Sequence, residues 1–81
     1  MKVFKLILSE KREEFIFNKA YEKFIKAKNR KSAYKKALEI AKVHFKRFKD
    51  APIPIIDKES ILWFGENTAV WINSIEEIEI I

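Results

Sequence analysis

The stretch of sequence that decides the fold reads Phe24-Ile25-Lys26-Ala27-Lys28-Asn29-Arg30-Lys31-Ser32-Ala33. It carries an extended apolar run through a polar turn into a helix. Ser32 is a residue type whose side chain accepts a hydrogen bond from a first-turn N–H, so we predict that it caps the helix. Neither Pro nor Gly occurs between Ala33 and Lys49. The sequence therefore predicts a helix that begins at Ser32 and continues to Lys49.

One side of this predicted helix is apolar and the opposite side is basic, at 100° per residue. We expect the apolar side to pack in the core, and it comprises Tyr34, Ala37, Leu38, Ala41, Phe45 and Phe48. The basic side is interrupted only by Glu39 and comprises Lys31, Lys35, Lys42, Lys46 and Lys49. The helix should end before Pro52 and Pro54, which have no N–H, and residues 50–57 are predicted to be a connector.

Strands are predicted before the helix. Lys2–Leu8 is rich in β-branched and aromatic residues, and the polar stretch Ser9–Glu14 should turn the chain. Phe15–Lys28 fits a helix through apolar residues at four-residue spacing, or a strand through its apolar odd positions. We favour the strand because its end is the passage quoted above. The odd positions concerned are Phe15, Phe17, Tyr21, Ile25 and Ala27.

Further strands are predicted after the connector. Ser60–Phe64 should pair with Thr68–Asn73 through a turn at Gly65-Glu66-Asn67, and Ile75–Ile81 should extend the second strand or add another. This order predicts a single small α+β domain over residues 1–81. We expect an antiparallel sheet of four to five strands, in the order ββαββ, with one long helix packed on one face.

The predicted sheet has more apolar surface than one helix can cover. Ile61–Phe64 and Val70–Ile72 are uninterrupted apolar runs, so both faces of these strands are apolar. Self-association would cover the second face. We therefore expect a homodimer or a higher homo-oligomer, with an interface that includes Trp63, Phe64 and Trp71.

Charge divides the chain into two opposed halves. The net charge is +5, but residues 1–49 contain 16 Lys/Arg against 5 Glu, and residues 50–81 contain one Lys against 7 Asp/Glu. The first part is therefore +11 and the second −6. A field of positive sign favours polyanions such as nucleic acid, nucleotides or an acidic protein surface, although lysine-rich surfaces are also common without any partner.

The densest group of cations leads into the helix N-terminus, where free N–H groups also attract phosphate. We predict an anion-binding site there, formed by Lys23, Lys26, Lys28, Arg30, Lys31, Lys35 and Tyr34. Tyr21, Phe24 and Tyr34 could stack on bases if they were exposed, but their spacing favours core packing. Sequence-specific reading of duplex DNA has no recognisable motif in this chain.

Catalysis has little support in the sequence. His44 is the one histidine, cysteine is absent, and Gly65 is the one glycine. A two-histidine metal site, a thiolate site, a P-loop and a dinucleotide fingerprint are therefore excluded within one chain. The serines lack a nucleophile-elbow context. We expect a protein that is not an enzyme and that uses no cofactor or metal.

Two segments carry a resemblance to a loose group of short, mostly uncharacterised phage and prophage proteins. These segments are Ile25-Lys26-Ala27 followed by Ser32–Leu38, and Trp71–Glu79, which ends in Ile/Glu alternation. With the strands and the helix to which these segments belong, the resemblance extends over about half of the chain. The resemblance implies a phage or mobile-element origin, this strand and helix order, and an accessory role such as blocking host defence. It carries no functional residue over to this sequence.

These observations predict a non-enzymatic binding module. Its basic surface would hold nucleic acid, a nucleotide signal, or a host defence protein that handles nucleic acid. The alternative is a protein-interaction inhibitor that acts through the aromatic and acidic hairpin Trp63–Glu79. No apolar run approaches the length of about 20 residues that spans a membrane, and the N-terminus does not resemble a secretion signal. We therefore expect no membrane association and a cytoplasmic location, in the host cell if the chain is phage-encoded.

Overall fold

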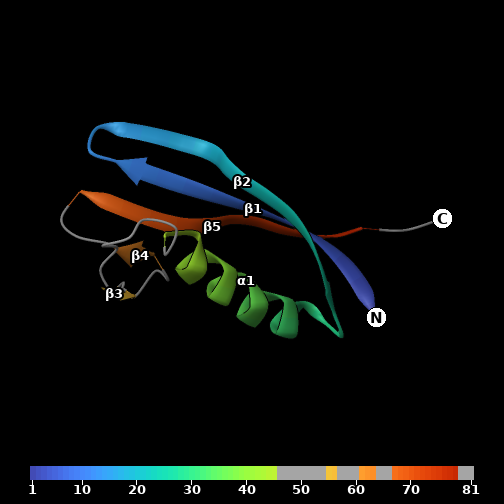
Figure 1. Ribbon diagram of the computed structural model, residues 1–81. Helices are drawn as coiled ribbons and strands as arrows, with labels where there is room; N and C mark the ends of the chain where they lie inside the picture. Colours follow the sequence, from blue (N-terminus) through green and yellow to red (C-terminus); the bar gives the residue numbers. More distant parts are fainter. Residues whose placement is uncertain (46–54, 57–60, 64–66, 79–81) are drawn as a thin grey trace.

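The computed structural model describes residues 1–45, 55–56, 61–63 and 67–78. Within these residues the elements are antiparallel strands and a helix (Figure 1), so the predicted α+β class with an antiparallel sheet is confirmed. The elements in chain order are β1 (Lys2–Arg12), β2 (Phe15–Ala27), α1 (Arg30–Phe45), β3 (Ile55–Ile56), β4 (Leu62–Trp63) and β5 (Thr68–Ile78).

β1 and β2 form a long hairpin with a turn at Glu13 and Glu14. The chain turns inside the predicted stretch Ser9–Glu14, but the turn is shorter than expected because β1 continues to Arg12. Ser9 is tolerated inside the strand because its hydroxyl is satisfied: it donates to the carbonyl oxygen of Asn18 at 2.8 Å and accepts from Nδ2 of Asn73 at 2.9 Å. The turn itself begins at Glu13, which has a φ of 54°.

β2 settles the ambiguity over Phe15–Lys28 in favour of the predicted strand. Its pairing with β1 shifts between Leu8 and Glu10, where residues 18–20 lie opposite Ser9. This bulge divides β2 into a first part that pairs with residues 10–12 and a second part that pairs with residues 2–8. Only the second part contributes to the core, through Ile25 and Ala27.

The strand order in the sheet is β2-β1-β5-β4-β3. β5 pairs with β1 over most of its length and with β4 at Val70 and Ala69. β5 ends at Ile78, so the described part of the predicted 75–81 segment extends the strand before it. β4 covers part of the predicted 60–64 strand, whereas Ile55 and Ile56 form a strand inside the predicted connector. Residues 64–66 and 79–81 of the predicted hairpin lie outside the described residues.

α1 begins earlier than predicted, and its cap is Asn29 rather than Ser32. Oδ1 of Asn29 accepts from the N–H of Ser32 at 2.8 Å, and its carbonyl oxygen accepts from the N–H of Ala33 at 3.0 Å. Both are the contacts of an N-cap residue. Ser32 is therefore the third residue of the helix. The predicted continuation over 46–49 lies outside the described residues.

Small residues of α1 lie in the same buried cluster as large residues of the sheet. The cluster combines Ala33, Ala37 and Ala41 with Phe4, Leu6, Leu8, Ile25, Leu62, Val70 and Ile75. Alanine at every fourth position lets a helix axis approach a sheet closely. Leu38 and Ile40 are partly buried against the cluster. Tyr34 departs from the predicted core face, since 37% of it is exposed. None of the described helices is long and apolar enough to cross a bilayer.

Candidate functional site

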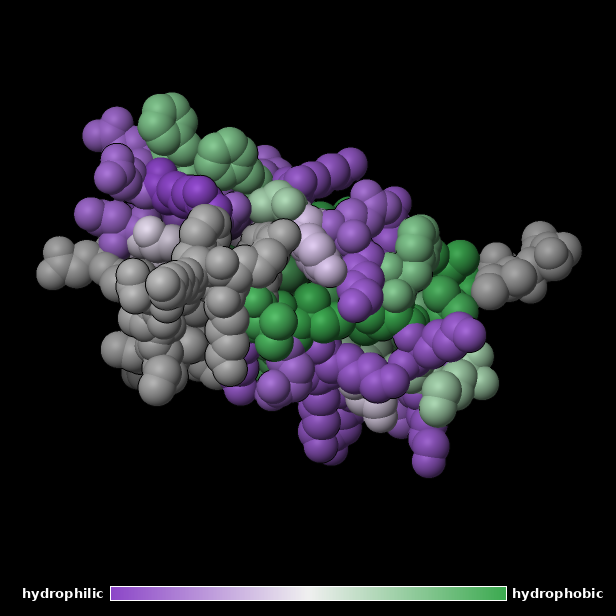
Figure 2. All heavy atoms as spheres, in the orientation of Figure 1, coloured by the Kyte–Doolittle hydropathy of each residue, from purple (hydrophilic) through white to green (hydrophobic). Residues whose placement is uncertain are grey.

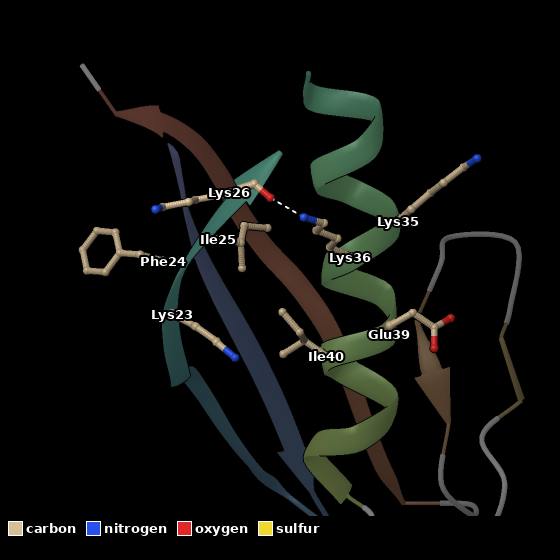
Figure 3. Close-up of a pocket in the computed structure, with 8 residues that line it drawn as sticks. All are labelled: Lys23, Phe24, Ile25, Lys26, Lys35, Lys36, Glu39 and Ile40. Carbon is tan, nitrogen blue, oxygen red and sulfur yellow. Dashed lines mark hydrogen bonds between the residues drawn. The ribbon is translucent and has the colours of Figure 1, made fainter. Parts of the chain in front are cut away.

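The residues predicted to bind an anion are divided between two sides of α1. Lys23, Lys26 and Lys35 line a hollow of about 530 Å³ between β2 and α1 (Figure 3). We call this hollow the β2–α1 groove. Its other lining residues are Phe24, Ile25, Lys36, Glu39 and Ile40.

The lining of the groove is apolar inside and basic at its margins. Figure 3 shows Ile25 and Ile40 directed into the space between strand and helix, together with Lys23. Phe24 and Lys26 point away from α1, as the alternation of a strand requires. The edge of β2 therefore presents a lysine on each side of the strand, with Phe24 beside Lys26.

A cation from the helix also reaches the edge of β2. β2 is the outermost strand of the described sheet, so its outward backbone groups have no neighbouring strand there. Nζ of Lys36 donates to the carbonyl oxygen of Lys26. This contact ties α1 to the end of β2. The sequence offered no signal that singles out Lys36 from the other lysines of the helix.

Two carboxylates on these elements are already paired with other lysines. Glu22 lies 3.2 Å from Nζ of Lys5, and Glu39 lies 3.2 Å from Nζ of Lys42. Within the part of the chain that the structure describes, no ion pair involves Lys23, Lys26 or Lys35. None of these three lysines is held in an ion pair with a described carboxylate, although Glu39 lines the same groove.

Phe24, like Tyr34, is an aromatic residue that was expected in the core and is exposed instead. Its spacing favoured the core, but 60% of it is exposed. It pairs with Lys5 on β1, and both lie on the face of the sheet opposite α1. Its neighbour Ile25 takes the position under the helix instead. A large apolar ring thus stands in solvent between Lys23 and Lys26.

Arg30 and Tyr34 lie on the other flank of α1. They line a hollow of about 400 Å³ with residues of β5, Trp71 among them. Nη1 of Arg30 donates to the carbonyl oxygen of Ile75 at 2.9 Å, so the guanidinium is fixed against the strand. Lys28 and Lys31 are exposed and line neither hollow. The predicted seven-residue site is therefore two separate sites and two isolated lysines.

The residues predicted to form an interface are only partly accessible. Trp63 and Trp71 are half-buried, and Nζ of Lys11 lies 5.9 Å from the ring centroid of Trp63. Phe64 lies outside the described residues. Three consecutive apolar side chains in the first part of β2 are more exposed than either Trp: Phe15, Ile16 and Phe17 are 67%, 59% and 48% exposed. The sequence did not predict this exposure, because apolar residues of high β-propensity are expected to lie in a buried part of a strand.

Metal-ligating groups do not converge in the described residues: no set of three His, Cys, Asp or Glu could hold an ion there. The backbone of His44 lies in the last turn of α1. The arrangement offers charge and an exposed ring, and these groups can bind without performing a reaction.

No family model, no curated protein and no solved structure matches this chain.

Proposed function

We propose that this chain is a non-enzymatic module that binds single-stranded nucleic acid along the second part of β2 and the adjoining flank of α1. The observation that carries the proposal is the exposure of Phe24, 60%, between lysines that pair with no described carboxylate. Binders of single strands combine a basic track for the backbone with aromatic rings on which bases stack.

Each part of the surface has a role in this proposal. Phe24 offers a ring face to a base. Lys26 on the same side, and Lys23 on the other, lie within one or two residues of that ring and would contact the flanking phosphates. Lys35 is on α1 at the margin of the groove; its side chain points away from β2 in Figure 3 and would contact a phosphate only where the strand continues past the helix. None of these contacts reads a base edge, so we expect little sequence preference.

A single strand fits this surface better than a duplex does. Stacking on Phe24 requires an unpaired base, because the bases of a duplex already stack on each other. A mononucleotide would carry too few phosphates to occupy lysines on both β2 and α1. The predicted phage accessory role, the host defence partner and the cytoplasmic location stay predictions.

The test is the salt dependence of affinity for a single-stranded oligonucleotide. Each phosphate contact contributes a slope of about −0.7 to the log–log plot of affinity against salt. The triple variant Lys23→Gln, Lys26→Gln, Lys35→Gln should flatten that slope by about 2. The matched control is Lys2→Gln, Lys28→Gln, Lys31→Gln, which removes the same charge from lysines that line neither hollow.

The control should leave the slope nearly unchanged. Equal flattening by both triple variants would contradict a defined site and indicate attraction by the overall charge alone. Absence of binding at low salt by the folded protein would also contradict the proposal. Tight binding of a mononucleotide with little salt dependence would favour the predicted nucleotide ligand instead.

A further inference from the structure

The first part of β2 exposes a continuous apolar segment on a free strand edge. Phe15, Ile16 and Phe17 pair with Arg12, Lys11 and Glu10 of β1 on one side. In the described sheet no strand lies on their other side. Figure 2 shows hydrophobic side chains standing among hydrophilic ones near this end of the β1–β2 hairpin. Exposed apolar residues on an unpaired edge mark a site of strand addition.

We propose that a second copy of this chain pairs with this edge, antiparallel, about a two-fold axis at Ile16. In that register Ile16 lies opposite Ile16 of the partner subunit, and Phe15 lies opposite Phe17 of the partner subunit. The segment is therefore complementary to itself, as a two-fold interface requires. Aromatic and β-branched residues are favoured as cross-strand neighbours.

The charges next to the segment agree with this register. Beyond the paired residues, Glu13 and Glu14 belong to the β1–β2 turn, and this turn would lie near Asn18 and Lys19 of the partner subunit. Two Glu–Lys contacts would therefore flank the apolar centre, one on each side of the axis. A register shifted by two residues along the strand would lose this complementarity.

A hollow beside Phe17 can accommodate the ring of Phe15 of the partner subunit. Phe17 lines a hollow of about 420 Å³ together with Glu10, Arg12, Lys19 and Ala20. Phe15 and Phe17 point to the same face of the strand, so Phe15 of the partner subunit would lie beside Phe17 at this hollow. Arg12 pairs with the buried Glu10 at 2.7 Å, and the exposed aliphatic part of Arg12 would contact the ring.

α1 does not obstruct the approach. The β1–β2 turn lies at the opposite end of the sheet from the turn into α1 (Figure 1). In the proposed register the partner's strand overlaps only the first part of β2 and continues past the turn into solvent. The bulge at residues 18–20 lies outside the apolar centre. The lysines of the β2–α1 groove stay accessible in both copies, so this inference is independent of the proposed function.

The contact area predicts a weak dimer. Phe15, Ile16 and Phe17 would together remove at most roughly 600 Å² from solvent over both copies, from side chains of about 150–250 Å² each that are about half to two-thirds exposed. Stable interfaces bury about twice that area. We therefore expect monomers at low micromolar concentration and dimers in the range of hundreds of micromolar.

The absence of cysteine permits a direct test by disulfide crosslinking. Ile16→Cys places two thiols across the two-fold axis and should form a covalent dimer under mild oxidation. Phe24→Cys is the matched control, because Phe24 is on the same strand and equally exposed, 60% against 59%. A mixture of Phe15→Cys with Phe17→Cys should crosslink faster than either variant alone, since these positions face each other only between copies.

Charge exchange gives a second measurement that leaves the apolar residues intact. Glu13→Lys and Lys19→Glu should each weaken the dimer in sedimentation equilibrium, and the double variant should restore it. Circular dichroism confirms that each variant is folded. Equal crosslinking of Ile16→Cys and Phe24→Cys would overturn the proposal, and so would a protein that stays monomeric at millimolar concentration.

Discussion

Phe24 and Ile25 are adjacent and both apolar, yet Phe24 is 60% exposed and Ile25 only 6%. A strand sends successive side chains to opposite faces, so the helix can cover one of these two residues but not both. α1 covers Ile25, which packs in the cluster with Phe4 and Leu6. The exposed ring of Phe24 is consequently free to meet a ligand.

Phe24→Ala should weaken binding of a single-stranded oligonucleotide by roughly 5- to 150-fold, because stacking of one base contributes about 1–3 kcal/mol. The melting temperature should hardly change, since the ring packs in no buried cluster. Fluorescence anisotropy with a labelled oligonucleotide measures the affinity. Val43→Ala removes an apolar side chain of similar exposure from α1 and should leave the affinity unchanged. Equal affinities of wild type and Phe24→Ala would contradict a stacking role.

Among the elements, β2 has two parts with different surroundings. Its second part lies beside α1 and contributes Ile25 and Ala27 to the core. Its first part lies beyond the bulge and pairs with β1 alone among the described strands. The same strand therefore offers a basic, ring-bearing edge at one end and an apolar, self-complementary edge at the other.

The start of α1 supplies a prediction about stability. Asn29→Ala should cost about 1 kcal/mol of unfolding free energy, because it removes the cap that accepts from the N–H of Ser32. Ser32→Ala should cost far less, since alanine is favoured inside a helix. Urea unfolding monitored by circular dichroism compares the two. A larger loss for Ser32→Ala than for Asn29→Ala would contradict the assignment of the cap.

At the scale of the whole molecule, the α+β class and the identity of the long elements could be predicted from the sequence. Alternation identified β1 and β2, and the uninterrupted polar and apolar pattern identified α1. The start of the helix was misplaced because Asn29 and Ser32 are both good caps, and only the backbone path distinguishes them. The bulge at residues 18–20 had no signal, since no Gly or Pro marks it.

The positive charge of the candidate site could be predicted from the sequence, but the division of its residues between the two flanks of α1 could not. Lys23 and Arg30 are close in sequence, yet they lie on opposite flanks of α1. Sequence spacing gives the distance between residues along the chain. The way in which the helix crosses the sheet decides on which flank of the helix each residue lies. Exposure of Phe15–Phe17 was equally hidden, because a strand pattern does not reveal where the covering helix ends.

The two proposals together predict cooperative binding along a long single strand. A dimer paired at Ile16 places the two Phe24 surfaces about 50–60 Å apart, from the rise of about 3.3 Å per residue. An oligonucleotide that reaches both surfaces should bind several-fold more tightly than one that reaches a single surface, because it holds two copies at an effective concentration of millimolar order, above that at which the free dimer forms. Ile16→Gln should abolish this advantage without changing affinity for the short oligonucleotide. Val43→Gln, at a residue of similar exposure, should retain it. Anisotropy titrations with both lengths measure the difference, and an advantage that survives Ile16→Gln would show that the two copies bind independently.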